Sequence, residues 1–194
     1  MLPIAPLMIE HRLIERMIAI IESQLSTILD RGKVDPVFVD KIVDFIRTYA
    51  DETHHGKEED ILFRELKNKY LSQKHQRTMN ELIEEHKQAR EATNEVLAAK
   101  TKLVEGDDSA LAIILDKLSW IVEFYPKHID KEDNHFFKEL KSYFSKEELD
   151  AMLEEGQTYD RKMIHKKYKD IVWNLRDKTN ADVEDLADNW LSFL

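Results

Sequence analysis

Histidine and acidic side chains of this chain occur in two matching sets. The dipeptide Glu-His at residues 10–11 recurs at residues 85–86, and the segment His-x-x-Lys-Glu at residues 54–58 recurs at residues 128–132. Each set therefore offers one histidine and, about forty residues later, a His-x-x-x-Glu pair. Six nitrogen and oxygen ligands from four segments predict a dinuclear metal site inside a helical bundle. The six candidate ligands are His11, His54, Glu58, His86, His128 and Glu132.

The spacing within each His-x-x-x-Glu pair is that of one helix face. Residues four apart are separated by about 40° around an α-helix and by about 6 Å along it, so both can reach one ion. Asp133 lies five residues after His128, about 140° around the helix, which favours Glu132 as the ligand. A kink at Pro126 would leave Asp133 as the alternative. Imidazoles and carboxylates in this combination suit iron, manganese or zinc.

Four more side chains lie close to the candidate ligands in the sequence. His55 and Glu59 are also four apart, but a repeat shifted by one residue would pair His55 with Ile129, so we expect both to flank the metal site. Tyr125 and His135 lie on the inward stripe of the fourth expected helix, before and after its histidine ligand. We expect these two to contact an exogenous ligand or the metal site. The alternatives are a core tyrosine and a histidine at the end of the bundle.

The hydrophobic pattern predicts four long helices and no strand. Apolar residues recur at alternating steps of three and four, as on the inward face of a bundle helix. Such helices, joined by short links, predict an all-α, up-down-up-down four-helix bundle over residues 1–144, with a C-terminal helical extension over residues 145–194. The expected bundle helices cover residues 3–32, 36–70, 74–105 and 109–143.

The composition excludes several classes of protein. The 194 residues carry a formal net charge of −10, which argues against nucleic acid as a partner because phosphate contacts need clustered Lys and Arg. The absence of cysteine excludes disulfides, iron–sulfur clusters and thiol catalysis. The N-terminal residues lack the pattern of a signal peptide, and no stretch approaches the roughly 20 apolar residues of a membrane span. We therefore expect a cytoplasmic protein without a nucleic-acid or membrane partner.

Four motifs along the chain share their residues with a known family. They are Glu-His-Arg at 10–12, His-His-x-x-Glu-Glu-x-x-Leu-Phe at 54–63, Glu-Glu-His-Lys at 84–87 and Tyr-Pro-x-His-Ile-x-Lys-Glu-Asp-x-x-Phe-Phe at 125–137. In these motifs the chain resembles the hemerythrin-like (HHE, cation-binding) family over residues 7–144. The resemblance implies a four-helix bundle that holds two iron ions bridged by an oxo or hydroxo group and by carboxylates. Zinc or manganese would suit the same ligands.

The resemblance also assigns roles to the six candidate ligands. The four histidines among them would be terminal ligands, and Glu58 and Glu132 would bridge the two ions. The third expected helix departs from respiratory hemerythrins, which carry His-x-x-x-His there. Leu82 and Arg90 stand four residues before and after His86, so one histidine ligand is missing. This departure disfavours reversible O₂ carriage and favours sensing, peroxide or NO chemistry, or iron handling.

Three functions remain open at the level of the sequence. The first is a non-haem di-iron protein that binds or senses O₂, NO or peroxide, or handles iron. The second is a di-iron oxidoreductase that decomposes peroxide or acts as an oxidase, and the third is a structural zinc-bound interaction module. The residues do not decide whether the chain is an enzyme. Trp173, Trp190 and Phe193 in the extension predict packing on the bundle or a homodimer surface.

Overall fold

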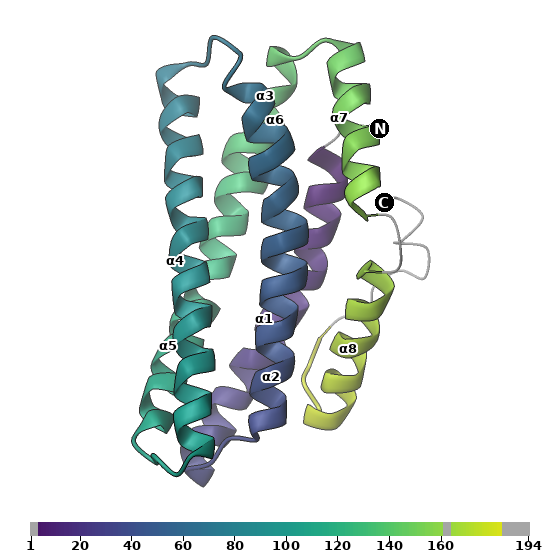
Figure 1. Ribbon diagram of the computed structural model, residues 1–194. Helices are drawn as coiled ribbons and strands as arrows, with labels where there is room; N and C mark the ends of the chain where they lie inside the picture. Colours follow the sequence, from purple (N-terminus) through teal and green to yellow (C-terminus); the bar gives the residue numbers. More distant parts are fainter. Residues whose placement is uncertain (1–3, 161–163, 184–194) are drawn as a thin grey trace.

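Helices form all the regular secondary structure of residues 4–160 and 164–183, the part of the chain that the computed structural model describes. Four long helical rods stand side by side and alternate in direction, and two shorter helices lie beside them (Figure 1). The prediction of an all-α bundle is confirmed. The first rod is α1 (Ile4–Arg31) and the third is α4 (Gln73–Val104).

The second and fourth rods each consist of several helical segments in succession. The second contains α2 (Pro36–Phe45), η1 (Ile46–His55), η2 (Glu58–Phe63) and α3 (Arg64–Leu66). The fourth contains α5 (Ala110–Asp130), η3 (Lys131–Phe136), α6 (Phe137–Leu140) and η4 (Lys141–Tyr143). The extension contributes α7 (Lys146–Asp160) and α8 (Ile164–Thr179).

Three of these segments, η1, η2 and η3, have the wider turn of a π-helix. Their hydrogen bonds join residues five apart, and such segments are frequent at functional sites. All three lie in the second and fourth rods, where the two His-x-x-x-Glu pairs occur. The wider turn rotates each following side chain relative to its place in a regular α-helix, so spacing arguments based on an α-helix fail across them.

Local chemistry fixes where the rods begin and end. The side chain of Asp35 accepts a hydrogen bond from the backbone of Val37 at 2.9 Å and so caps the second rod. Ser72 accepts one from the backbone of His75 at 3.2 Å and caps α4 in the same way. Gly32 follows α1 with φ +59°, a left-handed conformation that glycine adopts without steric cost. These ends agree with the predicted helix limits to within a few residues.

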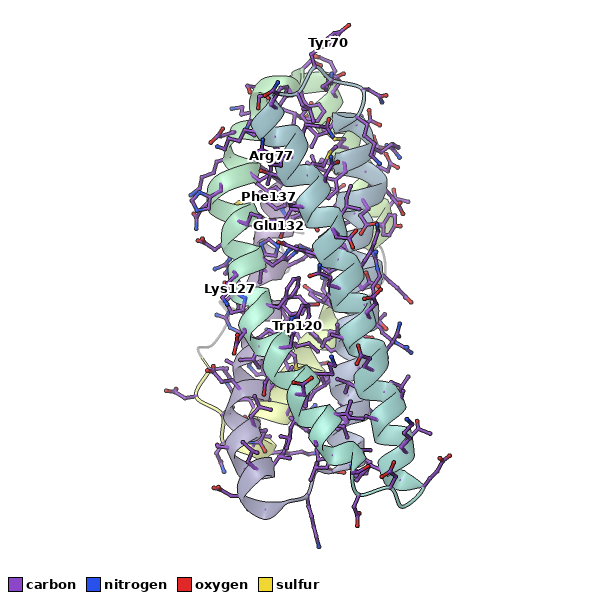
Figure 2. All side chains as sticks on the ribbon, turned by 90° about the vertical axis from the view of Figure 1, so that its left-hand side faces the viewer. Tyr70, Arg77, Trp120, Lys127, Glu132 and Phe137 are labelled. Carbon is purple, nitrogen blue, oxygen red and sulfur yellow. The ribbon has the colours of Figure 1, made fainter. Side chains whose placement is uncertain are left out.

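Two apolar clusters lie on either side of a polar layer in the bundle. One contains fully buried Ile21 and Ile114, and the other contains Leu66 and Leu140. Burial of each such side chain stabilises the fold by about 1.5–3 kcal/mol. Figure 2 shows Glu132 between the rods at the level of the polar layer. The stability of the two apolar ends offsets the cost of burying charged groups between them.

The extension packs along the side of the bundle. Helix α7 contacts η2, and α8 contacts α1 and η1 (Figure 1). The Tyr168 hydroxyl donates to the backbone oxygen of Asp44 at 3.1 Å, and its ring packs against that of Tyr49. Helix α7 continues through Gly156 to Asp160.

The aromatic residues of the extension are described only in part. Trp173 packs from α8 against the larger apolar cluster, whereas Trp190 and Phe193 lie outside the described residues. Within residues 4–160 and 164–183, no helix combines the length and the apolar character needed to cross a membrane.

Candidate metal centre

Seven side chains from all four rods meet in the polar layer of the bundle. Each of them is at most 2 % exposed, although all carry polar or ionisable groups. Six are the ligands predicted from the sequence, and the seventh, His55, was expected only to flank the site. The seven are His11 on α1, His54 and His55 on η1, Glu58 on η2, His86 on α4, His128 on α5 and Glu132 on η3.

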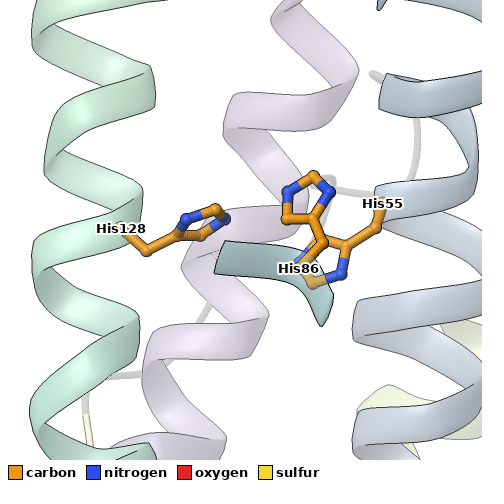
Figure 3. A group of neighbouring side chains, drawn as sticks. All are labelled: His55, His86 and His128. Carbon is orange, nitrogen blue, oxygen red and sulfur yellow. The ribbon is translucent and has the colours of Figure 1, made fainter. Parts of the chain in front are cut away.

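The ligand atoms of these side chains form two groups. Within each group the atoms lie within 4.8 Å of one another, close enough to bind one ion. The rings of the second group converge from three different rods (Figure 3). The first group is His11, His54, Glu58 and Glu132, and the second is His55, His86 and His128.

The two glutamates lie between the groups. One oxygen of Glu58 is 3.4 Å from Nε2 of His54 in the first group, and its other oxygen is 3.4 Å from Nε2 of His86 in the second. The oxygens of Glu132 likewise approach one histidine of each group, at 3.1 Å and 3.3 Å. Each carboxylate can therefore contact two ions at once, which is the arrangement of a bridging ligand.

Every imidazole of the cluster is held on its outer side by a carboxylate. An ionised carboxylate only accepts hydrogen bonds, so the proton of each ring lies on Nδ1 and the lone pair of Nε2 points to the centre. Four of the Nδ1–oxygen distances are 2.7 or 2.8 Å, and that of His55 is 3.3 Å. The pairs are His11–Asp133, His54–Glu10, His55–Asp51, His86–Glu59 and His128–Glu85.

The inner atoms of the cluster have no hydrogen-bond partner among the described residues. This holds for Nε2 of all five histidines and for all four oxygens of Glu58 and Glu132. Each buried polar atom without a partner costs about 1–3 kcal/mol, and more if it is charged. Lone pairs that face one another repel unless a cation lies between them. The residues present therefore fit metal ions, which would satisfy every one of these atoms.

Burial shifts the ionisation of the cluster in the direction that favours a cation. Burial raises the pKa of Glu58 and Glu132 well above the ordinary value, and neighbouring carboxylates raise it further. Burial lowers the pKa of His54 and His55 well below the ordinary value and that of His128 to about 4. The imidazoles are thus neutral at pH 7, as metal ligands must be, and bound cations would restore the charged form of the glutamates.

The carboxylates that support the histidines are themselves paired with basic side chains. Each of the four strongest supports belongs to the internal repeat, and each support is neutralised by a Lys or Arg near it in the bundle. The sequence signal for them was the same repeat that revealed the candidate ligands, although only Glu59 among them was expected to flank the site. The four pairs are Glu10–Lys57, Glu85–Lys131, Asp133–Arg12 and Glu59–Arg90.

His55 supplies the fifth imidazole, in place of the histidine absent from the third helix. Its ring stacks on that of His86, with 3.8 Å between the ring centroids. A regular α-helix would separate the directions of neighbouring side chains by about 100°. The π-helical η1 ends at this point, and both His54 and His55 face the centre. The sequence signal that could have identified His55 as a candidate ligand was its position directly after His54.

Of three other expectations about the site, the structure agrees with those for Glu132 and Glu59 and differs from that for His135. Glu132 faces the centre, whereas Asp133 supports His11 from outside. Glu59 flanks the site as the support of a ligand. His135 does not join the cluster: its side chain is 65 % exposed and its Nε2 lies 3.5 Å from Asp130. The expected position of His135 assumed regular α-helical spacing, which the π-helical η3 interrupts.

Tyr125 lies at the edge of the cluster. It is 1 % exposed, and its hydroxyl has no hydrogen-bond partner in the described part of the chain. Burial, followed by the charges of Asp51 and Glu132, raises its pKa above the ordinary value, so the hydroxyl keeps its proton. The hydroxyl is therefore a hydrogen-bond donor next to the candidate centre.

A helical bundle that buries histidines and carboxylates around a shared centre defines a class of metal-binding bundle proteins. Residues 2–140, and again residues 77–190, match the sequence model of the family described as Hemerythrin HHE cation binding domain. The chain belongs to this family, and the resemblance found in its motifs is confirmed. No curated protein and no solved structure matches the chain.

Proposed function

We propose that the chain is a non-haem di-iron protein that binds or senses a small ligand such as O₂, NO or peroxide. The observation that carries the proposal is the number of ligands: five imidazoles and two shared carboxylates, all buried and all with inward lone pairs. The first ion would be held by His11 and His54, and the second by His55, His86 and His128. Glu58 and Glu132 would bridge them. When bound, two irons supply reversible redox chemistry and positions for an exogenous ligand, because neither set fills an octahedron.

The residues of the chain would control what reaches such a centre. Phe137 stacks on His11 and Phe63 on His86, with ring centroids 6.1 Å and 6.2 Å apart, so apolar rings exclude water on one side. On the other side Tyr125 offers a hydroxyl donor. Iron handling would use the same ligands without this donor.

The open cavity at Tyr125 favours a second candidate, an oxidoreductase that consumes peroxide. Such an enzyme needs solvent access for a polar substrate, which a closed structural zinc site does not need. The cavity lies between η1 and α4, next to His55.

The test is to load metal-free protein with ferrous iron without oxygen and then add O₂, NO or hydrogen peroxide. A stable spectrum that reverses when the ligand is removed supports the binder or sensor. Repeated consumption of ligand per iron supports the oxidoreductase. A protein that accepts only zinc and shows no oxygen reactivity would contradict both and leave the structural role.

A further inference from the structure

A cavity of about 270 Å³ lies between η1 and α4, beside the candidate centre. Its outer rim includes the exposed side chains of Arg47, Glu52 and Asn94, and its inner wall includes the buried side chains of His55 and Tyr125. The cavity therefore leads from the surface to a candidate metal ligand.

The cavity lies where the internal repeat is broken by small side chains. Ala89 and Thr93 line it from α4. Their counterparts 75 residues earlier are Ile14 and Ile18, which are 1 % and 4 % exposed and fill the equivalent place on α1. An alanine and a threonine in place of two isoleucines leave space that a packed bundle would otherwise close. The opening thus distinguishes one half of the repeat from the other.

Two buried polar groups of the inner wall have an atom without a partner among the described residues. These are the hydroxyl of Tyr125 and Nε2 of His55. Asp51, between them and the rim, accepts hydrogen bonds from Arg90 at 2.7 Å and from His55 at 3.3 Å. The Asp51 carboxylate therefore already has hydrogen-bond donors within the protein. The hydroxyl of Tyr125 is the donor that a ligand in the cavity can use.

The charges around the cavity balance. The lining includes two arginines, Arg47 and Arg90, and two carboxylates, Asp51 and Glu52. It therefore favours neither an anion nor a cation, while its polar groups favour a molecule that forms hydrogen bonds. Resting on the proposed function, we propose that this cavity admits a small, neutral, hydrogen-bonding ligand of the hydrogen peroxide class, with Tyr125 as its hydrogen-bond donor. The lining is part polar and part apolar, so a neutral ligand that accepts a hydrogen bond from Tyr125 gains more from it than an apolar gas does. A small anion would gain no net charge attraction.

The first test removes only the hydroxyl, in the Tyr125→Phe variant. The iron content should not change, and the thermal midpoint should not fall, because the substitution removes a buried hydroxyl without a partner. The iron-loaded variant should bind hydrogen peroxide about fivefold more weakly, the equivalent of one neutral hydrogen bond. A variant that binds peroxide as tightly as the unaltered protein would overturn the role of Tyr125.

The second test closes the cavity by copying the other half of the repeat. Ala89→Ile and Thr93→Ile should each slow the reaction of iron-loaded protein with hydrogen peroxide at least about tenfold, at unchanged iron content. Ala98→Ile, on the exposed face of the same helix, is the matched control and should react at the original rate. Unchanged rates in both cavity variants, in a protein that does bind iron and peroxide, would overturn the cavity alone.

Azide and O₂ test the class of ligand, and iron content separates this inference from the proposed function. If the cavity variants slow the reaction with azide or O₂ as much as the reaction with peroxide, the assigned preference for a neutral hydrogen-bonding ligand is wrong. Slowing of peroxide alone supports it. An unaltered protein that takes up no iron would overturn the proposed function, and this inference with it.

Discussion

The two halves of the bundle arrange their histidines and supporting carboxylates alike and differ in how far these groups are exposed. In each half an Asp or Glu supports each of the two repeated histidines, and a Lys pairs with one of these supports. In the first half this pair is Glu10 and Lys57, whose side chains are 0 % and 5 % exposed. In the second half it is Glu85 and Lys131, whose side chains are 22 % and 30 % exposed.

The extension explains this difference in exposure. Asp160 of α7 accepts hydrogen bonds from Lys57 at 2.7 and 2.8 Å. Asp160 also lies 3.1 Å from Nε2 of His165, in the first turn of α8. The extension thus covers the polar support of the first half, and no described residue covers that of the second half in this way. The repeated arrangement is thus covered by the extension in the first half and partly exposed in the second.

The largest expected effect comes from the two glutamates that both groups of ligand atoms share. Glu58→Ala and Glu132→Ala should each weaken binding of both ions by more than the roughly 100-fold that loss of a supporting residue can cost, because each carboxylate contacts both groups. Metal analysis after dialysis measures this loss. Retention of both ions in either variant would show that the glutamate does not bridge.

The next substitution removes the largest difference between the halves. His55→Ile copies the counterpart residue Ile129. It should weaken the ion of the second group by about 100-fold and leave that of the first within about threefold. Stepwise titration of metal-free protein separates the two affinities. His135→Ala is the control, since this exposed histidine lies outside the cluster; an equal loss in the control would contradict the assignment.

A matched pair of substitutions compares the buried carboxylate Glu10, which supports His54, with the partly exposed carboxylate Glu85, which supports His128. Glu10→Gln should lower the free energy of unfolding by about 2 kcal/mol, because it leaves a buried charge network with fewer partners. Glu85→Gln, at a partly exposed site, should lower it by only about 0.5 kcal/mol. Urea unfolding of metal-free protein measures both values. Equal losses would mean that the extension does not alter the energetics of the first half.

The smallest expected effect is a dependence on pH that differs between metal-free and loaded protein. The pKa of Glu58 and Glu132 is raised in the folded state, so the stability they contribute is present below pH 4.5 and is lost as pH rises through the folded pKa. The pKa of His54 is lowered, so its contribution is lost as pH falls below 6.5.

Cations bound by the glutamates would hold them in their charged form and remove the loss of stability at high pH. The gap in thermal midpoint between loaded and metal-free protein should therefore widen from about pH 5 to about pH 8. Thermal unfolding followed by circular dichroism measures this gap. A gap that stays constant or narrows with rising pH would contradict a cation bound by these carboxylates.

The sequence predicted the four rods because their apolar spacing is regular and their ends carry caps or glycines. It predicted the convergence of the six candidate ligands because the repeat constrains them jointly. It did not predict that His55 faces the centre or that His135 faces solvent, since both outcomes depend on π-helical turns. It also did not predict that Asp160 seals one half, because this contact joins residues more than a hundred positions apart.

The dinuclear centre is tested most directly by titrating metal-free protein with ferrous iron under anaerobic conditions, followed by metal analysis and an absorption spectrum after oxidation. We expect about two irons per chain, one for each group of ligand atoms, and near-ultraviolet bands of an iron pair. Binding of one iron, or of none, would contradict a dinuclear centre shared by the two halves.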